Sequence, residues 1–371
     1  MDGVRLTLCV DALSAQPGGI GRYNWELCKG LAGHSGISEI RYYGRGRWIS
    51  DPSSLLRDEA LVGEKGGKLR KLARGWQEAR WLASSVVHGP NYFLPKVAKT
   101  GVITVHDLSV FRFPETHPVD RIRAFEKGFT DSLNRASHII TDTQTVRAEL
   151  IDRYDLPPGR VTAIWLGVAR DIRPMPSDEL VPTLMQWKIA PTAYALCVST
   201  LEPRKKIGEL LNAWRRLPRD LRDAYPLVLA GGAGWRNEAL LEQIAVGVAE
   251  GWLKHLGFVA EADLPALYSG AALFLYPSIY EGFGLPPLEA MACGAPVMVS
   301  SSSCLPEVCG EAARYIDPDD PDGFVQSIEA NLTDHAWRAG AALRGTAHAA
   351  GFDWATCIDR TVDVYRQVAA G

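Results

Sequence analysis

Short β-type runs alternate with amphipathic, helix-patterned segments from one end of the chain to the other. Such alternation predicts parallel β-sheets that are covered by helices on both faces. The predicted strands are Leu6–Val10, Glu39–Tyr43, Val86–His88, Val102–His106, His138–Asp142, Val161–Trp165, Tyr194–Ser199, Leu227–Ala230, His255–Phe258, Leu273–Tyr276, Pro296–Ser300 and Arg314–Ile316. Helices are expected between most of them, for example at Gly21–Leu31, Val119–Arg135, Gly208–Leu217 and Asn237–Val248.

The number of strands predicts more than one sheet. Twelve strands are about twice what one doubly wound sheet usually holds, and 371 residues exceed one ordinary core. We therefore expect an α/β chain with two Rossmann-like doubly wound domains facing a cleft, residues 1–172 and 183–350. The proline-containing segment Ala169–Pro182 is predicted to link them. Within residues 351–371, Trp354–Ala369 is expected to form a helix that packs back toward the N-terminal domain.

Composition narrows the class of protein. A hydrophobic content of 47% and a charged content of 22% are typical of a soluble globular chain, and a net charge of -3 argues against nucleic-acid binding. No apolar run has the length of a membrane helix, and no secretory signal is visible. The seven cysteines are scattered without a CxxC pair, which predicts reduced, mostly buried thiols in a cytoplasmic protein.

The segment 276–294, YPSIYEGFGLPPLEAMACG, carries the most specific chemical signal. Pro286 and Pro287 lack the backbone N–H that the first turn of a helix cannot use, so a helix is predicted to begin about there. Glu281 then lies in the loop before the helix, and Glu289 lies about one turn inside it.

The start of this helix also predicts an anion site. The amides of Gly284 and Leu285 are expected to point outward at the positive end of the helix dipole. One carboxylate would then lie on each side of a bound phosphate, placed to accept hydrogen bonds from sugar hydroxyl groups.

A second glycine segment, Gly18 and Gly19, lies between the first strand and the first helix. Two glycines allow positive φ and a close approach to a ligand, and the helix amides that follow can face a phosphate. A plain strand-to-helix turn is the alternative. A dinucleotide site is disfavoured because residues 19–24, GIGRYN, lack the last glycine of GxGxxG, although Glu39 lies near the expected distance for a ribose-binding acid.

Taken in order and spacing, these segments resemble the retaining, nucleotide-sugar-dependent glycosyltransferases with the GT-B fold, in the group usually called family 4. Within that group the chain is most similar to bacterial GDP-mannose-dependent mannosyltransferases of surface-polysaccharide synthesis. The resemblance covers nearly the whole chain. It is carried by residues 18–23 (GGIGRY), 88–95 (HGPNYFLP), 104–109 (TVHDLS), 201–205 (LEPRK), 229–232 (LAGG), 255–259 (HLGFV), the Glu281/Glu289 segment and 303–308 (SCLPEV).

The resemblance implies that Arg204 and Lys205 bind the pyrophosphate of the donor. Fixed cations suit this task because the departing diphosphate gains negative charge as the glycosidic bond breaks. A solvated charged turn would be the better interpretation of an isolated basic pair. The chain departs from the family pattern at two residues, with Ser199 where the family often has Gly and Lys206 where it often has Asn. Both departures leave the two cations in place.

The resemblance further implies that Glu281 faces the transferred sugar and that Glu289 holds the ribose hydroxyls, since an ionised carboxylate accepts two such hydrogen bonds well. His106, at the end of a buried-looking strand, would contact the donor sugar near the reacting carbon. The alternatives are an exposed, ion-paired helix residue for Glu289 and a structural strand-end histidine for His106.

Strand ends in the second domain are where a nucleotide base would stack. The predicted donor-binding set is Gly18, Gly19, Gly231, Phe258, Val259, Gly282, Phe283, Gly284, Leu285 and Glu289, beside the predicted catalytic residues His106, Glu281, Arg204 and Lys205. His88 and Asn91 are expected on the acceptor side.

No metal or other cofactor is expected. The pairs Asp317-Pro318-Asp319 and Asp320-Pro321-Asp322 resemble the DxD pairs that hold a divalent metal in the other main glycosyltransferase fold. Here they follow a strand and contain two prolines, which favours a turn and a helix start. No histidine cluster indicates zinc.

The segment Lys65–Trp81 combines six basic residues with Trp76 and Trp81. A basic, aromatic helix can lie on an anionic membrane surface, which would suit a lipid-linked acceptor at the inner face of the membrane. A solvated helix with two anchoring tryptophans explains the pattern equally well.

These observations predict transfer of a hexose, first of all mannose from GDP-mannose, to a saccharide or lipid-linked saccharide acceptor with retention. The first domain would bind the acceptor and the second the nucleotide sugar. Alternatives are another donor, such as UDP-glucose or GDP-rhamnose, a non-catalytic sugar-nucleotide-binding subunit, and an NAD-dependent oxidoreductase.

Overall fold

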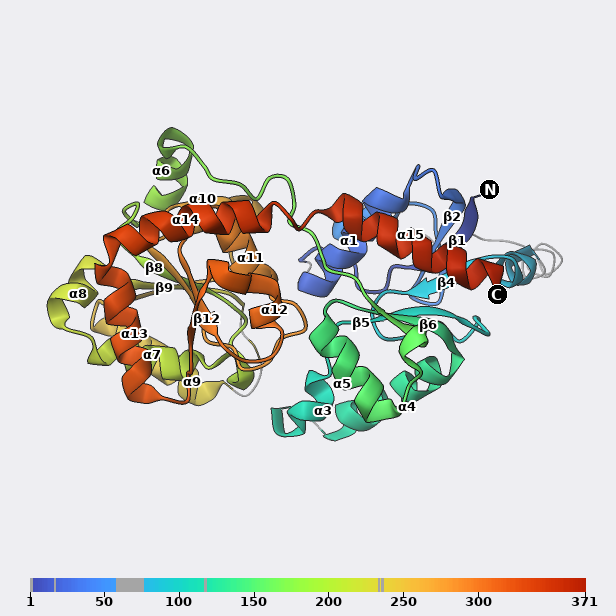
Figure 1. Ribbon diagram of the computed structural model, residues 1–371, viewed down its shortest axis with the longest axis horizontal. Coiled ribbons are helices and arrows are strands. Elements are labelled where there is room, and N and C mark those ends of the chain that lie inside the picture. The colour runs from blue at the N-terminus through green and yellow to red at the C-terminus, as the bar shows by residue number, and fades with distance from the viewer. Residues whose placement is uncertain (1–2, 17, 58–76, 117–118, 233, 235–236) are drawn as a thin grey trace. The chain divides into compact units, whose positions relative to one another are not determined.

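The computed structural model describes residues 3–16, 18–57, 77–116, 119–232, 234 and 237–371. The chain divides into two compact units (Figure 1). Unit 1 consists of Met1–Leu108, Val119–Gly167 and Trp354–Gly371, and unit 2 consists of Ser109–Pro118 and Val168–Asp353. The last segment of the chain therefore belongs to the same unit as the first.

Unit 1 is built on a sheet that has seven strands among the described residues, in the order β3-β2-β1-β4-β5-β6-β7. All neighbours are parallel except β2 and β3. The strands are β1 (Val4–Cys9), β2 (Ile37–Gly44), β3 (Arg47–Ile49), β4 (Val86–Gly89), β5 (Gly101–Val105), β6 (Ala136–Thr141) and β7 (Val161–Ala163). Its helices are α1 (Gly19–Leu31), α4 (Val119–Arg135), α5 (Gln144–Tyr154) and α15 (Trp354–Ala370), with 3-10 turns η1 (Pro52–Arg57) and η3 (Pro158–Arg160) and a helical stretch at 77–83.

Unit 2 has a parallel sheet in the order β10-β9-β8-β11-β12-β13. The strands are β8 (Ala195–Val198), β9 (Leu227–Ala230), β10 (Leu253–Gly257), β11 (Leu273–Tyr276), β12 (Val297–Ser300) and β13 (Arg314–Ile316). The helices are α3 (Ser109–Arg112), α6 (Ser177–Met185), α7 (Ile207–Arg216), α8 (Arg219–Ala224), α9 (Glu238–Ala249), α10 (Leu264–Ser269), α11 (Leu285–Ala292), α12 (Leu305–Cys309), α13 (Pro321–Thr333) and α14 (His335–Ala349). The 3-10 turns are η2 (Pro114–Thr116), η4 (Pro203–Lys205), η5 (Glu261–Asp263) and η6 (Gly310–Ala312).

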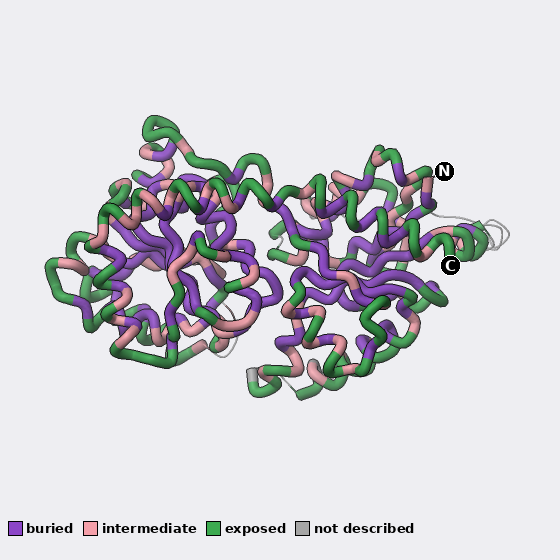
Figure 2. The backbone as a smooth tube through the Cα atoms, in the orientation of Figure 1, coloured by how far each residue is buried: buried purple, intermediate pink, exposed green. Residues whose placement is uncertain are grey.

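Burial explains why these segments form these elements. The central strands are mostly apolar because helices cover both of their faces, and Figure 2 shows them as the buried part of each unit. Helix α7 buries Ile207, Leu210, Leu211 and Trp214 at helical spacing against the unit 2 sheet. Each such side chain contributes roughly 1.5–3 kcal/mol when it is fully buried. The packing thus fixes where the carboxyl ends of the strands lie.

The predicted class of two Rossmann-like parallel sheets is confirmed, and each of the twelve predicted strands overlaps an observed one. Strand β3 was not predicted. It is only three residues long and pairs antiparallel with β2 through a tight turn at Arg45 and Gly46, both at positive φ. A strand that short carries no recognisable alternation.

The predicted linker Ala169–Pro182 is wrong over its second half, because α6 begins at Ser177 and contains Pro182. Two acidic residues in its first turn favour the start of a helix. Pro182 removes one backbone donor from a short helix, and the buried Leu180 and Leu184 hold one face of α6 in place.

The predicted C-terminal helix is confirmed as α15, which packs within unit 1 against α1. A side chain at Gly30 would place its Cβ 2.5 Å from Ile358, so a glycine is needed for the two helices to approach. On the sheet side, the hydroxyl of Tyr365 lies 2.7 Å from Nδ1 of His88.

Candidate active site

The glutamate loop lies where β11 ends and α11 begins. Helix α11 starts at Leu285, with Pro286 and Pro287 in its first turn, as predicted. The preceding residue, Gly284, has φ +100°, and a side chain there would also meet Leu305 at 2.9 Å. Only glycine accepts this conformation without strain, so the loop can turn sharply into the helix.

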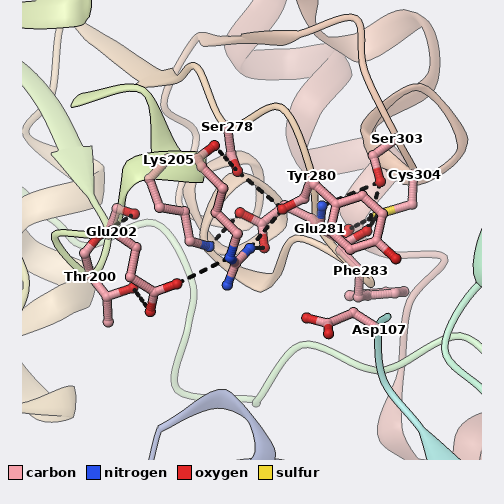
Figure 3. A network of polar contacts seen from close by, with 12 residues as sticks. Asp107, Thr200, Glu202, Lys205, Ser278, Tyr280, Glu281, Phe283, Ser303 and Cys304 are labelled. Atoms are coloured by element: carbon pink, nitrogen blue, oxygen red, sulfur yellow. Dashed lines mark hydrogen bonds and ion pairs between the residues drawn. The ribbon is translucent and has the colours of Figure 1, made fainter. Parts of the chain in front are cut away.

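Two cations reach Glu281 from η4, the 3-10 turn that follows β8 (Figure 3). The ammonium of Lys205 donates to the Glu281 carboxylate and, at 3.0 Å, to the hydroxyl of Tyr276. Arg204 donates from Nη1 to Glu281 Oε2 at 3.2 Å, and its Nε donates to Glu202 at 3.0 Å. The carboxyl ends of two neighbouring strands, β8 and β11, thus supply one polar network.

Arg204 also fastens the two loops to each other through the main chain. Its Nη1 donates to the carbonyl of Tyr280 at 2.6 Å, and its own carbonyl accepts from the amide of Ile279 at 3.0 Å. The two loops that carry the network, after β8 and after β11, are therefore held together by two hydrogen bonds to main-chain groups.

Charge in this network is balanced and largely shielded from water. Arg204 and Lys205 face the carboxylates of Glu202 and Glu281, and these side chains are between 7% and 14% exposed. Burial alone would raise the pKa of Glu281, but Lys205 and then Arg204 outweigh it and lower that pKa to about 2. The carboxylate is therefore ionised at neutral pH.

The sequence predicted Glu281, Arg204 and Lys205 at one site, and the structure brings all three together. It also adds a contact that was not predicted, because Glu281 is paired directly with the two cations. Glu202 and Tyr276 were missed as members of the network. Tyr276 ends a predicted strand, and Glu202 lies two residues before the basic pair. These positions are the signal that could have identified them.

Glu289 lies inside α11 and is 3% exposed. Its Oε2 accepts a hydrogen bond from the hydroxyl of Tyr268 on α10 at 2.9 Å. The exposed position that the alternative assumed for Glu289 is therefore wrong. The buried tyrosine thus orients the Glu289 carboxylate.

The ends of β9 and β10 form the part of unit 2 where base stacking was expected. Gly231 has φ +148°, and a Cβ there would lie 1.8 Å from the carbonyl oxygen of Ser199, so no other residue fits. Its amide donates to the carbonyl of Gly257 at 2.7 Å. Phe258 is 56% exposed, whereas Val259 is buried.

The two predicted glycine segments, residues 282–284 and 18–19, differ in structure. Phe283, next to Gly282, is buried, and its ring centroid lies 6.1 Å from that of Phe352. In unit 1, Gly18 precedes α1 with φ -76°, and Gly19 is not among the glycines with positive φ. The pair therefore does not use the positive φ that glycine allows. A Cβ at Gly18 would meet nothing within 4 Å, so there is open space at that residue.

His106 follows β5 and uses both ring nitrogens inside unit 1. Nδ1 lies 2.8 Å from the Asp142 carboxylate and Nε2 lies 2.9 Å from the carbonyl oxygen of Pro90. Burial lowers the pKa of His106, but the Asp142 charge and these hydrogen bonds outweigh it and raise the pKa. Both ring nitrogens therefore have partners within unit 1, and the contact of His106 with the donor sugar stays a prediction. Asp142, at the end of β6, was missed.

His88 is fully buried, and the acceptor-side role predicted for it stays a prediction. Its two ring nitrogens lie 2.7 Å from the Tyr365 hydroxyl and 2.8 Å from that of Thr104. Burial, and after it the charge of His106, lower its pKa to about 3, so the ring is neutral. Asn91 is half-buried, and its carbonyl accepts from the amide of Phe93 at 2.7 Å.

The aspartate-proline pairs form the turn and helix start that the sequence predicted. Asp320 caps α13 by accepting from the Gly323 amide at 3.1 Å. Asp319 pairs with Lys206 at 2.7 Å. Among the described residues, no group of three or more His, Cys, Asp or Glu side chains is arranged to hold a metal ion.

The basic segment Lys65–Trp81 lies mostly outside the described residues. Trp81 is described and is 6% exposed, with its Nε1 donating to Thr7 at 2.8 Å and the Arg41 guanidinium 3.9 Å from its ring centroid. This tryptophan is an interior anchor. No helix in the described part of the chain is long and apolar enough to cross a membrane. All seven cysteines are buried and free.

A surface cavity of about 890 Å³ lies elsewhere, at the amino ends of β1, β4 and β5. Its lining includes one basic and one acidic side chain, Arg5 and Glu39. Ligands of parallel α/β sheets bind beyond the carboxyl ends of the strands. The network around Glu281 is at such an end, and we take it as the candidate active site.

Two family models match most of the chain. Residues 187–344 match the family model described as "Glycosyl transferases group 1", and residues 17–171 match "Glycosyltransferase Family 4". The chain is 39% identical over 365 residues to O-antigen chain mannosyltransferase B of Escherichia coli, covering 94% of this chain and 96% of that protein.

Solved structures align over nearly the full length. The crystal structure of Anabaena HepE in complex with UDP and glucose aligns with a TM-score of 0.74 and 20% identity, covering 97% of this chain and 99% of that one. WaaG, a glycosyltransferase involved in lipopolysaccharide biosynthesis, aligns with a TM-score of 0.74 and 15% identity, with the same coverage. At these identities the alignments establish the fold.

Proposed function

Because this chain belongs to the glycosyltransferases with the GT-B fold, we propose that it is a hexosyltransferase that moves mannose from GDP-mannose to a saccharide acceptor with retention. The sugar is chosen because the E. coli relative with 39% identity is named a mannosyltransferase of the O-antigen chain. We propose an acceptor of surface-polysaccharide synthesis, free or lipid-linked, because the same relative is named for the O-antigen chain. The seven buried free thiols are compatible with a reducing, cytoplasmic environment.

The observation that carries the proposal is the network of Arg204, Lys205 and Glu281 beside the start of α11. A nucleotide sugar has a diphosphate, which needs cations and amide donors, and a sugar, which needs hydrogen-bond acceptors. The network supplies the cations and a carboxylate within one unit, and the turn at Gly284 adds a helix N-terminus.

Donor binding would exchange partners in this network. Without a ligand, Glu281 is the counter-charge of Lys205 and Arg204. The donor diphosphate takes over that part, which leaves the Glu281 carboxylate to accept hydrogen bonds from the sugar. The two cations thus keep a counter-charge in both states, and the sugar hydroxyls supply hydrogen bonds to the Glu281 carboxylate.

In the proposed reaction the bond between the anomeric carbon and the diphosphate oxygen breaks with both electrons passing to the diphosphate. Arg204 and Lys205 stabilise that growing charge in a shielded site, without a metal ion. The acceptor hydroxyl forms its bond from the face that the diphosphate leaves, and its proton passes to a donor phosphate oxygen. Glu281 positions the sugar. Glu289 binds ribose hydroxyls, and exposed Phe258 stacks on the base.

The test is a transfer assay with the purified chain, a panel of donors (GDP-mannose, GDP-rhamnose and UDP-glucose) and lipid-linked or free saccharide acceptors. We expect GDP release with GDP-mannose, activity that persists in EDTA, and an α-anomeric product by proton NMR, matching the donor. Preference for another donor would overturn the mannose assignment. An inverted anomer would overturn retention, and strict dependence on added Mg²⁺ or Mn²⁺ would overturn the role of the two cations.

A further inference from the structure

The peptide unit of Glu281 is held from its other side by the loop that follows β12. The hydroxyl of Ser303 accepts from the amide of Glu281 at 3.2 Å and donates to the carbonyl of the same residue at 2.8 Å. One side chain therefore satisfies both main-chain groups of the glutamate (Figure 3). Such a two-point contact fixes the position and the orientation of the residue together.

Cys304 extends this contact along the loop. Its thiol lies 3.1 Å from the carbonyl oxygen of Glu281 and 3.2 Å from that of Phe283, and the side chain is fully buried. The sulfur thus spans the glycine turn from one side to the other. A thiol is a weak donor, so its part is to fill and shape the turn while Ser303 supplies the stronger bonds.

Ser303 makes these bonds from a strained backbone. It has φ +58°, in the left-handed region that glycine and asparagine adopt far more readily than serine. Strained non-glycine residues persist where the surrounding structure holds them, and they concentrate at functional sites. At Ser303 the strain is offset by the hydroxyl bonds to Glu281, which a glycine in this position could not make.

We propose that Ser303 is a positioning residue for the reaction, clamping the main chain of Glu281 so that its carboxylate is correctly placed for the donor sugar. The inference rests on the proposed function, since it assigns to Ser303 the task of orienting Glu281. Lys205 and Arg204 hold the Glu281 carboxylate only until a diphosphate takes its place as their counter-charge. From that point the two bonds of the Ser303 hydroxyl still hold the Glu281 main chain, beside the contacts of Arg204 with Tyr280 and Ile279. An error of about 1 Å in the position of Glu281 can cost a hundredfold in rate.

Two substitutions at Ser303 separate the effect of its hydroxyl bonds from the effect of its strained backbone. Ser303→Ala removes the hydroxyl and keeps the unfavourable backbone, whereas Ser303→Gly removes the hydroxyl and relieves it. If the clamp positions Glu281, both variants lose roughly 10- to 100-fold in kcat with GDP-mannose, with smaller changes in KM. Thermal stability separates them, since the glycine variant is at least as stable as the alanine variant. Ser301→Ala, an exposed serine of the same loop, is the matched control and keeps the wild-type rate.

Hydrogen exchange tests the clamp without any turnover. In peptides covering residues 277–285, both Ser303 variants are expected to exchange the Glu281 amide at least tenfold faster than the wild type, and Ser301→Ala is not. Wild-type kcat in Ser303→Gly, or unchanged exchange at Glu281, would overturn the inference. If the wild-type chain transfers no sugar from any donor while exchange rises as expected, the clamp stands and the proposed function fails.

Discussion

Glu281 is the residue on which both the charge balance of the site and the proposed chemistry depend. It is 7% exposed, and its carboxylate is shared between Lys205 and Arg204. A buried ion pair adds little net stability, but removing one partner leaves the other charge uncompensated. The diphosphate of the proposed donor also brings negative charge to Lys205 and Arg204. Stability and ligand binding are therefore coupled at this residue, which gives two predictions.

Glu281→Gln is expected to cost about 3–5 kcal/mol of unfolding free energy, since Lys205 and Arg204 lose a buried counter-charge. GDP should restore part of that loss, because its diphosphate replaces the missing carboxylate. The rise in Tm on adding GDP is then larger for the variant than for the wild type, although transfer activity is lost. Differential scanning fluorimetry with and without GDP measures both effects.

The control for this experiment is Glu209→Gln, which removes an exposed carboxylate paired with Lys206 at 3.1 Å. It should cost no more than about 1 kcal/mol and leave the GDP shift unchanged. Equal GDP shifts in the wild type and in Glu281→Gln would contradict the exchange of partners.

The pKa of Glu281 predicts how this contribution depends on pH. The folded pKa of about 2 lies below the ordinary value of 4.5, so the carboxylate stabilises the folded state above pH 4.5. That stabilisation declines as the pH falls from 4.5 toward 2. Urea unfolding of the wild type and Glu281→Gln at several pH values should show a constant difference near neutrality that shrinks on the acid side. A difference that grows on acidification would show that the carboxylate is not paired in the folded protein.

At the scale of elements, the sequence predicted the strands and the residues at their ends, because buried parallel strands are apolar runs that stop at polar motifs. The partners of those residues were not predictable. Glu281 and Lys205 are far apart in the chain, and nothing in either motif shows which other loop approaches it. His106 shows the same limit, since its strand end was predicted correctly and the Asp142 carboxylate that occupies it was not.

The structure explains how Lys206 is accommodated where the family often has asparagine. It adopts φ +53°, a conformation that the asparagine often found there tolerates better. The lysine ammonium instead pairs with Glu209 and Asp319 at either side of the turn. The sequence showed that Lys206 replaces the usual asparagine. Its ion pair with Asp319 was not predictable, because it depends on α13 lying beside α7.

The turn after β9 allows a prediction with a control in the neighbouring residue. Gly231→Ala would bring its Cβ to 1.8 Å from the Ser199 carbonyl at φ +148°, so the backbone must move and we expect a loss of at least about 2 kcal/mol. Gly232→Ala meets nothing within 4 Å and should change stability by less than about 0.5 kcal/mol. Denaturant unfolding compares the two variants, and similar losses would show that the turn is not held at Ser199.

At the scale of the whole molecule, the chain closes unit 1 with its last helix after building all of unit 2. Helix α15 packs on α1, and Tyr365 is fully buried beside His88 of β4. The stability of the N-terminal sheet therefore depends on residues at the opposite end of the chain. Each unit has its own buried core, so local changes should be felt in one unit at a time.

Two buried tyrosines test this directly, one in each unit. Tyr365→Phe removes the partner of His88 Nδ1, and Tyr194→Phe removes the hydroxyl that donates to the Leu267 carbonyl at 2.6 Å. Each should cost about 1–3 kcal/mol, because a buried polar group is left unsatisfied. In hydrogen-exchange mass spectrometry, Tyr365→Phe should speed exchange in β1 and β4 and leave β8 and β9 unchanged, and Tyr194→Phe should do the reverse. If either variant speeds exchange equally in both sheets, the two units unfold together and the C-terminal helix stabilises the whole chain rather than unit 1.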